Sequence, residues 1–278
     1  RIVSSIQDLW LHTYAQFSPD DGEDATFGHP FGSFDPAAGY MYIDRVCYRV
    51  PSDVSSQFGP TKKKQLQRSL TPHLDCCPHD IYGKGSKWRP IQAFLCLTDT
   101  LLPDHGGFEA CPGHHLHFAE WAEKRSVGAA RPGGEAPAAS PPCVGDFTPI
   151  RPIEDKDVLE KFRHIACKAG DLVCWVCIRS LLYSLFSPFL KSSLLISQDY
   201  RIPHANSRHN FAPHARAVVY IGLLPAVPIN ARYAELQLEK FRRGEVPSDQ
   251  WHESSATQPC TYQFSELGAK LMGMTPWN

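Results

Sequence analysis

The sequence predicts a mainly β protein, a sandwich or barrel of strands with helices at its periphery. Two observations support this class. Many short segments alternate apolar or aromatic with polar residues, and turns rich in Gly and Pro separate them. With 278 residues and 42% hydrophobic side chains, the chain can bury a full core, and we expect a single domain.

The elements can be placed along the chain from residue type and spacing. The predicted strands, rich in β-branched and aromatic residues, cover residues 40–50, 88–98, 172–175 and 216–224. The predicted helices cover residues 118–125, 153–162 and 233–243, and the last ends at Gly244. Residues 1–16 fit either a strand or a short helix, and residues 127–143, dominated by Ala, Pro and Gly, predict a mobile loop.

The charge balance excludes some partners. There are 28 Lys and Arg against 29 Asp and Glu, a net charge of −1, so we expect no nucleic acid and no anionic membrane as a partner. The 10 Cys lack the density of a small disulfide scaffold and predict mostly reduced thiols in a cytoplasmic protein. Because the chain begins at Arg1, organellar targeting stays an open alternative.

One stretch does not fit a β scaffold. Residues 176–198 are rich in Ser, Leu and Phe, and they place Gly170 34 residues before His204, far more than one strand needs. One interpretation is a translated intron, because its removal joins Trp175 to Asp199 in one continuous strand. The other is a genuine apolar insertion that forms a lid or contacts a membrane, although its charges make it a poor transmembrane helix.

The strongest chemical signal is the stretch Thr71–Asp75. In an extended chain, residues two apart point to the same face, so His73 and Asp75 can bind one metal ion while Leu74 faces the other way. A third ligand must come from far along the chain, and His204 is the best candidate. Two His and one carboxylate are the ligands of non-haem Fe(II) oxygenases, which leave positions open for a cosubstrate and O₂.

Further motifs follow in a characteristic order. After His73 and Asp75 come Trp88–Gln92, Gly106–Gly107, Pro112–His115, Ala169–Asp171, His204 and Arg216. In this order the chain resembles the phytanoyl-CoA dioxygenase family of Fe(II)- and 2-oxoglutarate-dependent oxygenases. The resemblance implies a double-stranded β-helix, a cupin-like jelly roll whose open mouth holds the metal. It places the core at about 42–224, followed by a helical extension at 225–278.

The resemblance also implies roles for single residues. His73, Asp75 and His204 resemble the iron ligands of the family. Arg216, twelve residues after His204, resembles the Arg that grips the distal carboxylate of 2-oxoglutarate. A planar guanidinium suits a bidentate carboxylate contact, and Arg208 is the rival for this role.

Two more side chains are candidates for the cosubstrate pocket. Gln92 is on a predicted buried strand, and Asn206 stands two residues after the distal His, with Ser207 next. The implied reaction hydroxylates an aliphatic C–H of a small organic substrate with O₂ and 2-oxoglutarate, releasing succinate and CO₂. The alternative is a metal-binding jelly roll with other metal chemistry or a binding role, which would not need Arg216.

Overall fold

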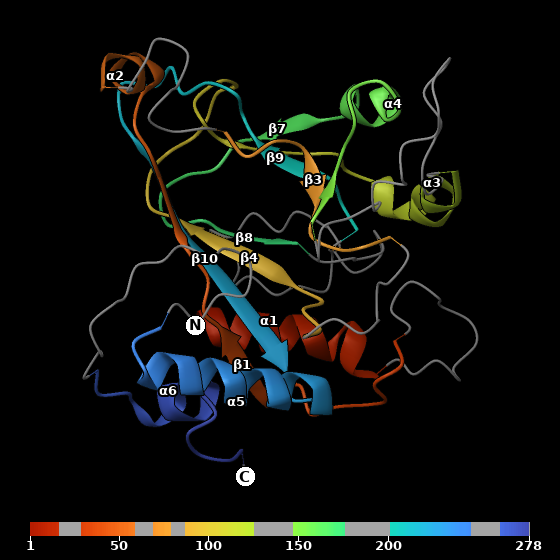
Figure 1. The fold of residues 1–278 in the computed structure, drawn as a ribbon, viewed down its shortest axis with the longest axis vertical. Helices are drawn as coiled ribbons and strands as arrows, with labels where there is room; N and C mark the ends of the chain where they lie inside the picture. Colours follow the sequence, from red (N-terminus) through yellow and green to blue (C-terminus); the bar gives the residue numbers. More distant parts are fainter. Residues whose placement is uncertain are drawn as a thin grey trace. The chain divides into compact units, whose positions relative to one another are not determined.

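The computed structural model describes residues 1–16, 29–58, 69–78, 87–124, 147–175, 201–245 and 262–277 (Figure 1). The predicted loop at 127–143 and the anomalous stretch at 176–198 lie outside these residues. The chain divides into two compact units. The first consists of Arg1–Arg45, Ser86–Ala93 and Tyr220–Asn278, and the second of Val46–Gly85 and Phe94–Val219. The single-domain organisation stays a prediction.

The first unit packs helices around strand β1 (Gly39–Tyr42). Helices α5 (Pro228–Arg242) and α6 (Glu266–Leu271) both contact this strand. Helix α1 (Ile2–Leu11), which the turn η1 (Tyr14–Gln16) follows, brings Trp10 against the same strand. A Cβ at Gly39 would lie 2.9 Å from the Trp10 ring, so only glycine allows this approach.

A buried amide fixes α5 within this unit. Asn230 is fully buried, and its Oδ1 accepts a hydrogen bond of 2.7 Å from the backbone N–H of Trp88. Its Nδ2 donates to the carbonyl oxygens of Trp88 and Pro225, each at 2.9 Å. One side chain therefore satisfies three buried backbone groups from two separate segments.

The second unit contains a five-stranded sheet whose order is β6-β3-β9-β5-β7. These short strands are β3 (His73–Leu74), β5 (Phe108–Ala110), β6 (Thr148–Pro149), β7 (Arg163–Ile165) and β9 (His204–Asn206). All four pairings are antiparallel, and His204 lies opposite His73 on one side and Ala110 on the other. The sheet thus joins two predicted ligands that are far apart in sequence. The unit also contains α2 (Ser52–Phe58), η3 (His114–His117), α3 (Phe118–Lys124), α4 (Lys156–Leu159) and β8 (Leu172–Trp175).

The other sheet has the order β1-β10-β4-β8, and β2 (Val46–Arg49) also pairs with β10 (Arg216–Pro225). The prediction of one strand over 40–50 is wrong, because β1 and β2 are separate. Tyr42 pairs with Gly222 and Val46 with Val219, so three residues between the strands face two on β10. The additional residue makes a bulge.

Most other predicted elements are present with different bounds. Strand β4 is confined to Gln92–Cys96, and the helix expected over 153–162 is only the four residues of α4. Helix α5 begins five residues earlier than predicted, at Pro228, which suits the first helical position because it has no N–H to satisfy. Antiparallel sheets with several helices are confirmed, and the jelly-roll topology stays a prediction.

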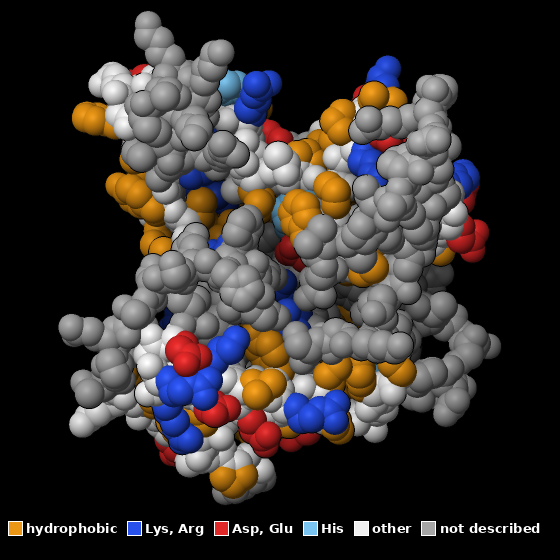
Figure 2. Space-filling model, viewed as in Figure 1, with side chains coloured by type: hydrophobic (Ala, Val, Ile, Leu, Met, Phe, Trp, Pro, Cys, Tyr) orange, Lys and Arg blue, Asp and Glu red, His pale blue; other side chains and the backbone are white. Residues whose placement is uncertain are grey.

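In the described part of the chain, the surface charge is mixed and most cysteines are free, as the sequence predicts. Figure 2 shows Lys and Arg beside Asp and Glu over α5 and α6, where Arg243 pairs with Glu239. The described cysteines that are free are Cys47, Cys76, Cys96, Cys111, Cys167 and Cys174, whereas Cys77 forms a disulfide. No helix among the described residues is long and apolar enough to span a bilayer.

Candidate metal centre

Three predicted ligands meet in the second unit. His73, Asp75 and His204 each offer one ligand atom, and these atoms lie within 4.8 Å of one another. Nε2 of His73 is 3.3 Å from Oδ1 of Asp75, and Nε2 of His204 is 3.5 Å from Oδ2 of the same carboxylate. Both imidazoles are buried, while the carboxylate keeps 20% of its side-chain surface exposed. Of the described residues, these three form the group that could hold a metal ion.

Backbone carbonyls set the tautomer of both histidines. Nδ1 of His73 lies 2.7 Å from the carbonyl oxygen of Thr71, and Nδ1 of His204 lies 3.1 Å from that of Ile202. A carbonyl only accepts, so each Nδ1 carries a proton and each Nε2 is turned toward Asp75. Each Nε2 donates to the carboxylate when its imidazole is protonated and can offer its lone pair to a metal ion when the imidazole is neutral. This second hydrogen bond is the usual way in which a protein orients a metal-binding imidazole. The two rings and the carboxylate therefore fit a divalent metal ion.

The electrostatics of the cluster favour a cation. Burial disfavours the charged form of Asp75, but the hydrogen bonds and charges of His204 and His73 together outweigh it and hold the pKa of Asp75 well below its usual value. Burial likewise opposes a charge on His73, yet the contact with Asp75 raises its pKa. An ionised carboxylate thus lies between two imidazoles, and a metal ion can take the place of the proton they compete for.

Aromatic rings pack the ligands in place. Phe147 stacks on His73 with ring centroids 4.9 Å apart, and Phe108 lies 5.8 Å from His204. Leu74, which lies between His73 on β3 and Asp75 directly after it, is fully buried in a core cluster that also contains Cys111 and Val158. The predicted alternation is therefore present over these three residues, with His73 and Asp75 at the metal cluster and Leu74 in the apolar core.

Arg216 is one of the largest fully buried side chains, with 1% of its surface exposed. Its Nη1 donates to Sγ of Cys47 at 3.1 Å, and its guanidinium carbon lies 5.7 Å from the centroid of the Phe94 ring. In the described part of the chain it forms no ion pair with a carboxylate. A thiol and an aromatic face compensate a buried charge poorly, so the group is suited to an anion that the described residues do not supply.

The other predicted cosubstrate residues have different outcomes. Arg208, the rival anchor, is exposed. Asn206 is buried on β9, and Phe108 lies opposite it. Ser207 is occupied, because its Oγ donates to the carbonyl oxygen of His209 at 2.9 Å. Gln92 is buried on β4 but belongs to the first unit, so its role at the site stays a prediction.

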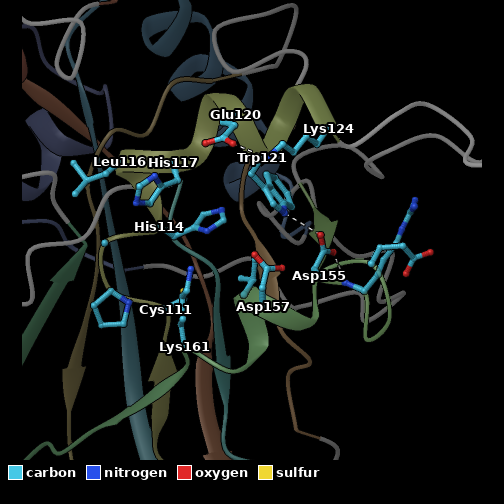
Figure 3. Close-up of a pocket in the computed structure, with 15 residues that line it drawn as sticks. Cys111, His114, Leu116, His117, Glu120, Trp121, Lys124, Asp155, Asp157 and Lys161 are labelled. Atoms are coloured by element: carbon cyan, nitrogen blue, oxygen red, sulfur yellow. Dashed lines mark hydrogen bonds and ion pairs between the residues drawn. The ribbon is translucent and has the colours of Figure 1, made fainter.

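A cavity of about 580 Å³ lies elsewhere in the second unit. Figure 3 shows its two walls, His114 and Trp121 on one side and Asp155 and Asp157 on the other. Trp121 Nε1 donates to Asp155 at 2.9 Å, which braces the walls. Burial lowers the pKa of His114 to about 4, and its Nε2 has no partner among the described residues.

This cavity is not the pocket of the metal cluster. Cys111 and Val158 line it, and both pack in the same apolar cluster as Leu74. Leu74 points away from its neighbours His73 and Asp75, so the cavity lies behind β3. Sequence reasoning missed it, because its walls come from two separate segments, residues 111–124 and the segment around α4. The motif Pro112–His115 lies in the first of them but does not reveal which segment faces it.

Comparison with known proteins supports the fold. No protein-family profile matches the sequence, and no curated protein sequence matches it. GlcNAc Inducible Gene 2 (GIG2, DUF1479) of Candida albicans matches 88% of this chain with a TM-score of 0.58 and 14% identity. The "Putative Oxidoreductase" of Salmonella typhimurium LT2 matches 98% with a TM-score of 0.62 and 15% identity.

A third neighbour is the hypothetical protein JW0805 of Escherichia coli, with a TM-score of 0.60, 15% identity and 98% of this chain covered. The chain spans 58% of the Candida protein, 63% of the Salmonella protein and 64% of the Escherichia protein. Because these identities are low and the neighbours longer, the likeness concerns the fold. The chain thus shares its fold with three longer proteins and contains a buried cluster of two His and one Asp suited to a metal ion.

Proposed function

We propose that this protein is an Fe(II)- and 2-oxoglutarate-dependent dioxygenase that hydroxylates an aliphatic C–H of a small organic substrate, as the resemblance to the phytanoyl-CoA dioxygenase family implies. One observation carries the proposal: a 2-His-1-carboxylate cluster occurs in the same unit as a buried arginine that has no carboxylate partner among the described residues. The oxidoreductase name of the Salmonella neighbour agrees with this class of reaction.

The residues would divide the work as follows. His73, Asp75 and His204 would hold Fe(II), leaving coordination positions open. Arg216 would bind the distal carboxylate of 2-oxoglutarate through its planar fork, and Asn206 would contribute a polar side chain on the strand of His204. The iron would supply O₂ activation coupled to the decarboxylation of 2-oxoglutarate, yielding succinate and CO₂.

The experiment that tests the proposal follows 2-oxoglutarate itself, because the hydroxylated substrate is not needed to see its turnover. Protein reconstituted anaerobically with Fe(II) is mixed with 2-oxoglutarate and O₂, and succinate is measured by mass spectrometry. We expect succinate from the intact protein and none from Asp75→Ala. Hydroxylases of this kind turn over slowly without their substrate, so a library of small organic acids and acyl conjugates is added to accelerate the reaction.

A negative result distinguishes the alternative function. If Fe(II) binds to the triad but 2-oxoglutarate neither binds nor is consumed, the protein is a metal-binding jelly roll without oxygenase activity. The buried Arg216 argues against this alternative, because other metal chemistry does not require a buried guanidinium that lacks a carboxylate among the described residues of the same unit.

A further inference from the structure

We propose that Arg49 is a positioning residue that sets the spacing between Arg216 and the strand carrying His204, and so determines which dicarboxylate length the site accepts. The inference rests on the proposed function, because it concerns how the same site would hold its cosubstrate. Sequence reasoning did not single out Arg49, which is the next-to-last residue of the strand predicted over 40–50 and belongs to no motif.

The side chain of Arg49 joins the ends of two strands. It is buried, with 7% of its surface exposed. Its Nη1 donates to the carbonyl oxygens of Ser207 at 2.9 Å and Gly106 at 3.3 Å, and its Nη2 donates to that of Arg208 at 3.3 Å. Ser207 and Arg208 directly follow β9, and Gly106 shortly precedes β5, which pairs with β9.

The backbone of Arg49 links these ends of β9 and β5 to Arg216, the proposed carboxylate anchor. Arg49 on β2 lies directly opposite Arg216 on β10 in an antiparallel pair. Side chains of such a pair emerge on the same face of the sheet, about 5 Å apart at their Cα atoms. Asn210, almost fully buried, donates from Nδ2 to the carbonyl oxygen of Arg49 at 3.1 Å and holds it from the other side.

Arg49 therefore connects the two points that a 2-oxo dicarboxylate must bridge. One is the guanidinium of Arg216, and the other is the metal cluster, to which β9 contributes His204. A ligand that spans two fixed groups is selected by its length only if the distance between them is held rigidly. Two guanidinium nitrogens reaching three carbonyls can hold that distance, whereas the single ammonium of Lys cannot reproduce the fork.

The test compares two acids that differ by one methylene. Dissociation constants of 2-oxoglutarate and 2-oxoadipate are measured by calorimetry on protein loaded with Fe(II) under anaerobic conditions. We expect the intact protein to prefer 2-oxoglutarate, and Arg49→Lys to bring the ratio of the two constants about tenfold closer to one. Arg49→Ala, if it folds by circular dichroism, should lose more of the preference.

The matched control is Arg163→Lys. Arg163 is exposed on β7 of the same unit and also donates to carbonyls, those of Glu160 at 2.9 Å and Phe162 at 2.7 Å. This variant should keep the preference of the intact protein. A purely structural role of Arg49 would weaken Fe(II) and both acids together and leave the ratio unchanged.

Three results would overturn the inference in different ways. An unchanged ratio in Arg49→Lys, with a selective intact protein, removes the role of Arg49 and leaves the proposed function standing. An intact protein that binds neither acid removes the proposed function and the inference with it. An intact protein that binds both acids equally has no length selectivity for Arg49 to set.

Discussion

Replacing Arg216 is the sharpest test of the carboxylate anchor. The guanidinium is 1% exposed, and its described partners are the thiol of Cys47 and the ring of Phe94. Removing one partner of a desolvated charge pair costs roughly 2–5 kcal/mol. This corresponds to a loss of about 30-fold to several thousand-fold in affinity for 2-oxoglutarate. We expect Arg216→Ala to show this loss and Arg216→Lys, which keeps the charge without the fork, a smaller one.

Removing the charge of Arg216 should weaken the binding of 2-oxoglutarate but should not lower the melting temperature of the protein without ligand. A buried charge that lacks a carboxylate partner destabilises the fold that contains it. Arg216→Met fills a similar volume without the charge, so its melting temperature should equal or exceed that of the intact protein. Adding 2-oxoglutarate to the Fe(II)-loaded proteins should raise the melting temperature of the intact protein only, because binding stabilises the state that binds.

The assay is therefore a pair of measurements on each variant, the dissociation constant for 2-oxoglutarate and the thermal midpoint without it. Fe(II) affinity, measured anaerobically, should remain nearly unchanged, since Arg216 is not a metal ligand. Arg208→Ala is the control, because Arg208 is exposed. If Arg208→Ala loses 2-oxoglutarate selectively and Arg216→Ala does not, the assignment of the anchor is wrong.

Three further predictions concern single side chains. His73→Ala or His204→Ala should abolish Fe(II) binding with the circular dichroism spectrum retained, and unchanged affinity would remove that residue from the site. Asn230→Ala should cost about 2–4 kcal/mol in urea unfolding, because three backbone groups lose their partner, whereas the exposed Glu235→Ala on the same helix should change little. Burial lowers the pKa of His114 to about 4 in the folded protein, so on acidification the unfolded chain takes up the proton first. Stability should then fall between about pH 6.5 and 4, by up to about 3 kcal/mol, and His114→Gln should lose less. The measurement is the fall in the urea midpoint from pH 7 to pH 4.5, and an equal fall in the intact protein and in His114→Gln would contradict this prediction.

The parts that could be predicted from the sequence depend on local pattern. Alternation placed His73 and Asp75 on one face of a strand, and the apolar run before Pro225 marked β10. Helix α3 was predictable from its period, and the end of α5 from Gly244, whose backbone has a positive φ of 69°.

The parts that could not be predicted depend on what the fold brings together. The split of β1 from β2 follows from an additional residue opposite β10, and a strand pattern does not show its partner's length. Arg49 acts through three carbonyls from two loops, so no spacing in the sequence marks it. The cavity behind β3 likewise has walls from two distant segments. Helix α6 was missed because six residues are too few to show a period.

The register of β3 and β9 makes metal binding depend on correct strand alignment. His73 and His204 are direct partners across the ladder, so the two imidazoles meet in one alignment of the strands and in no other. A slip by one residue would present Ala205 to the ligand face and turn His204 to the opposite one. Only a chain with correctly paired strands would therefore bind the metal ion, because a chain with shifted strands lacks one of the three ligands. Metal content per chain would then report the fraction of correctly aligned molecules in a preparation.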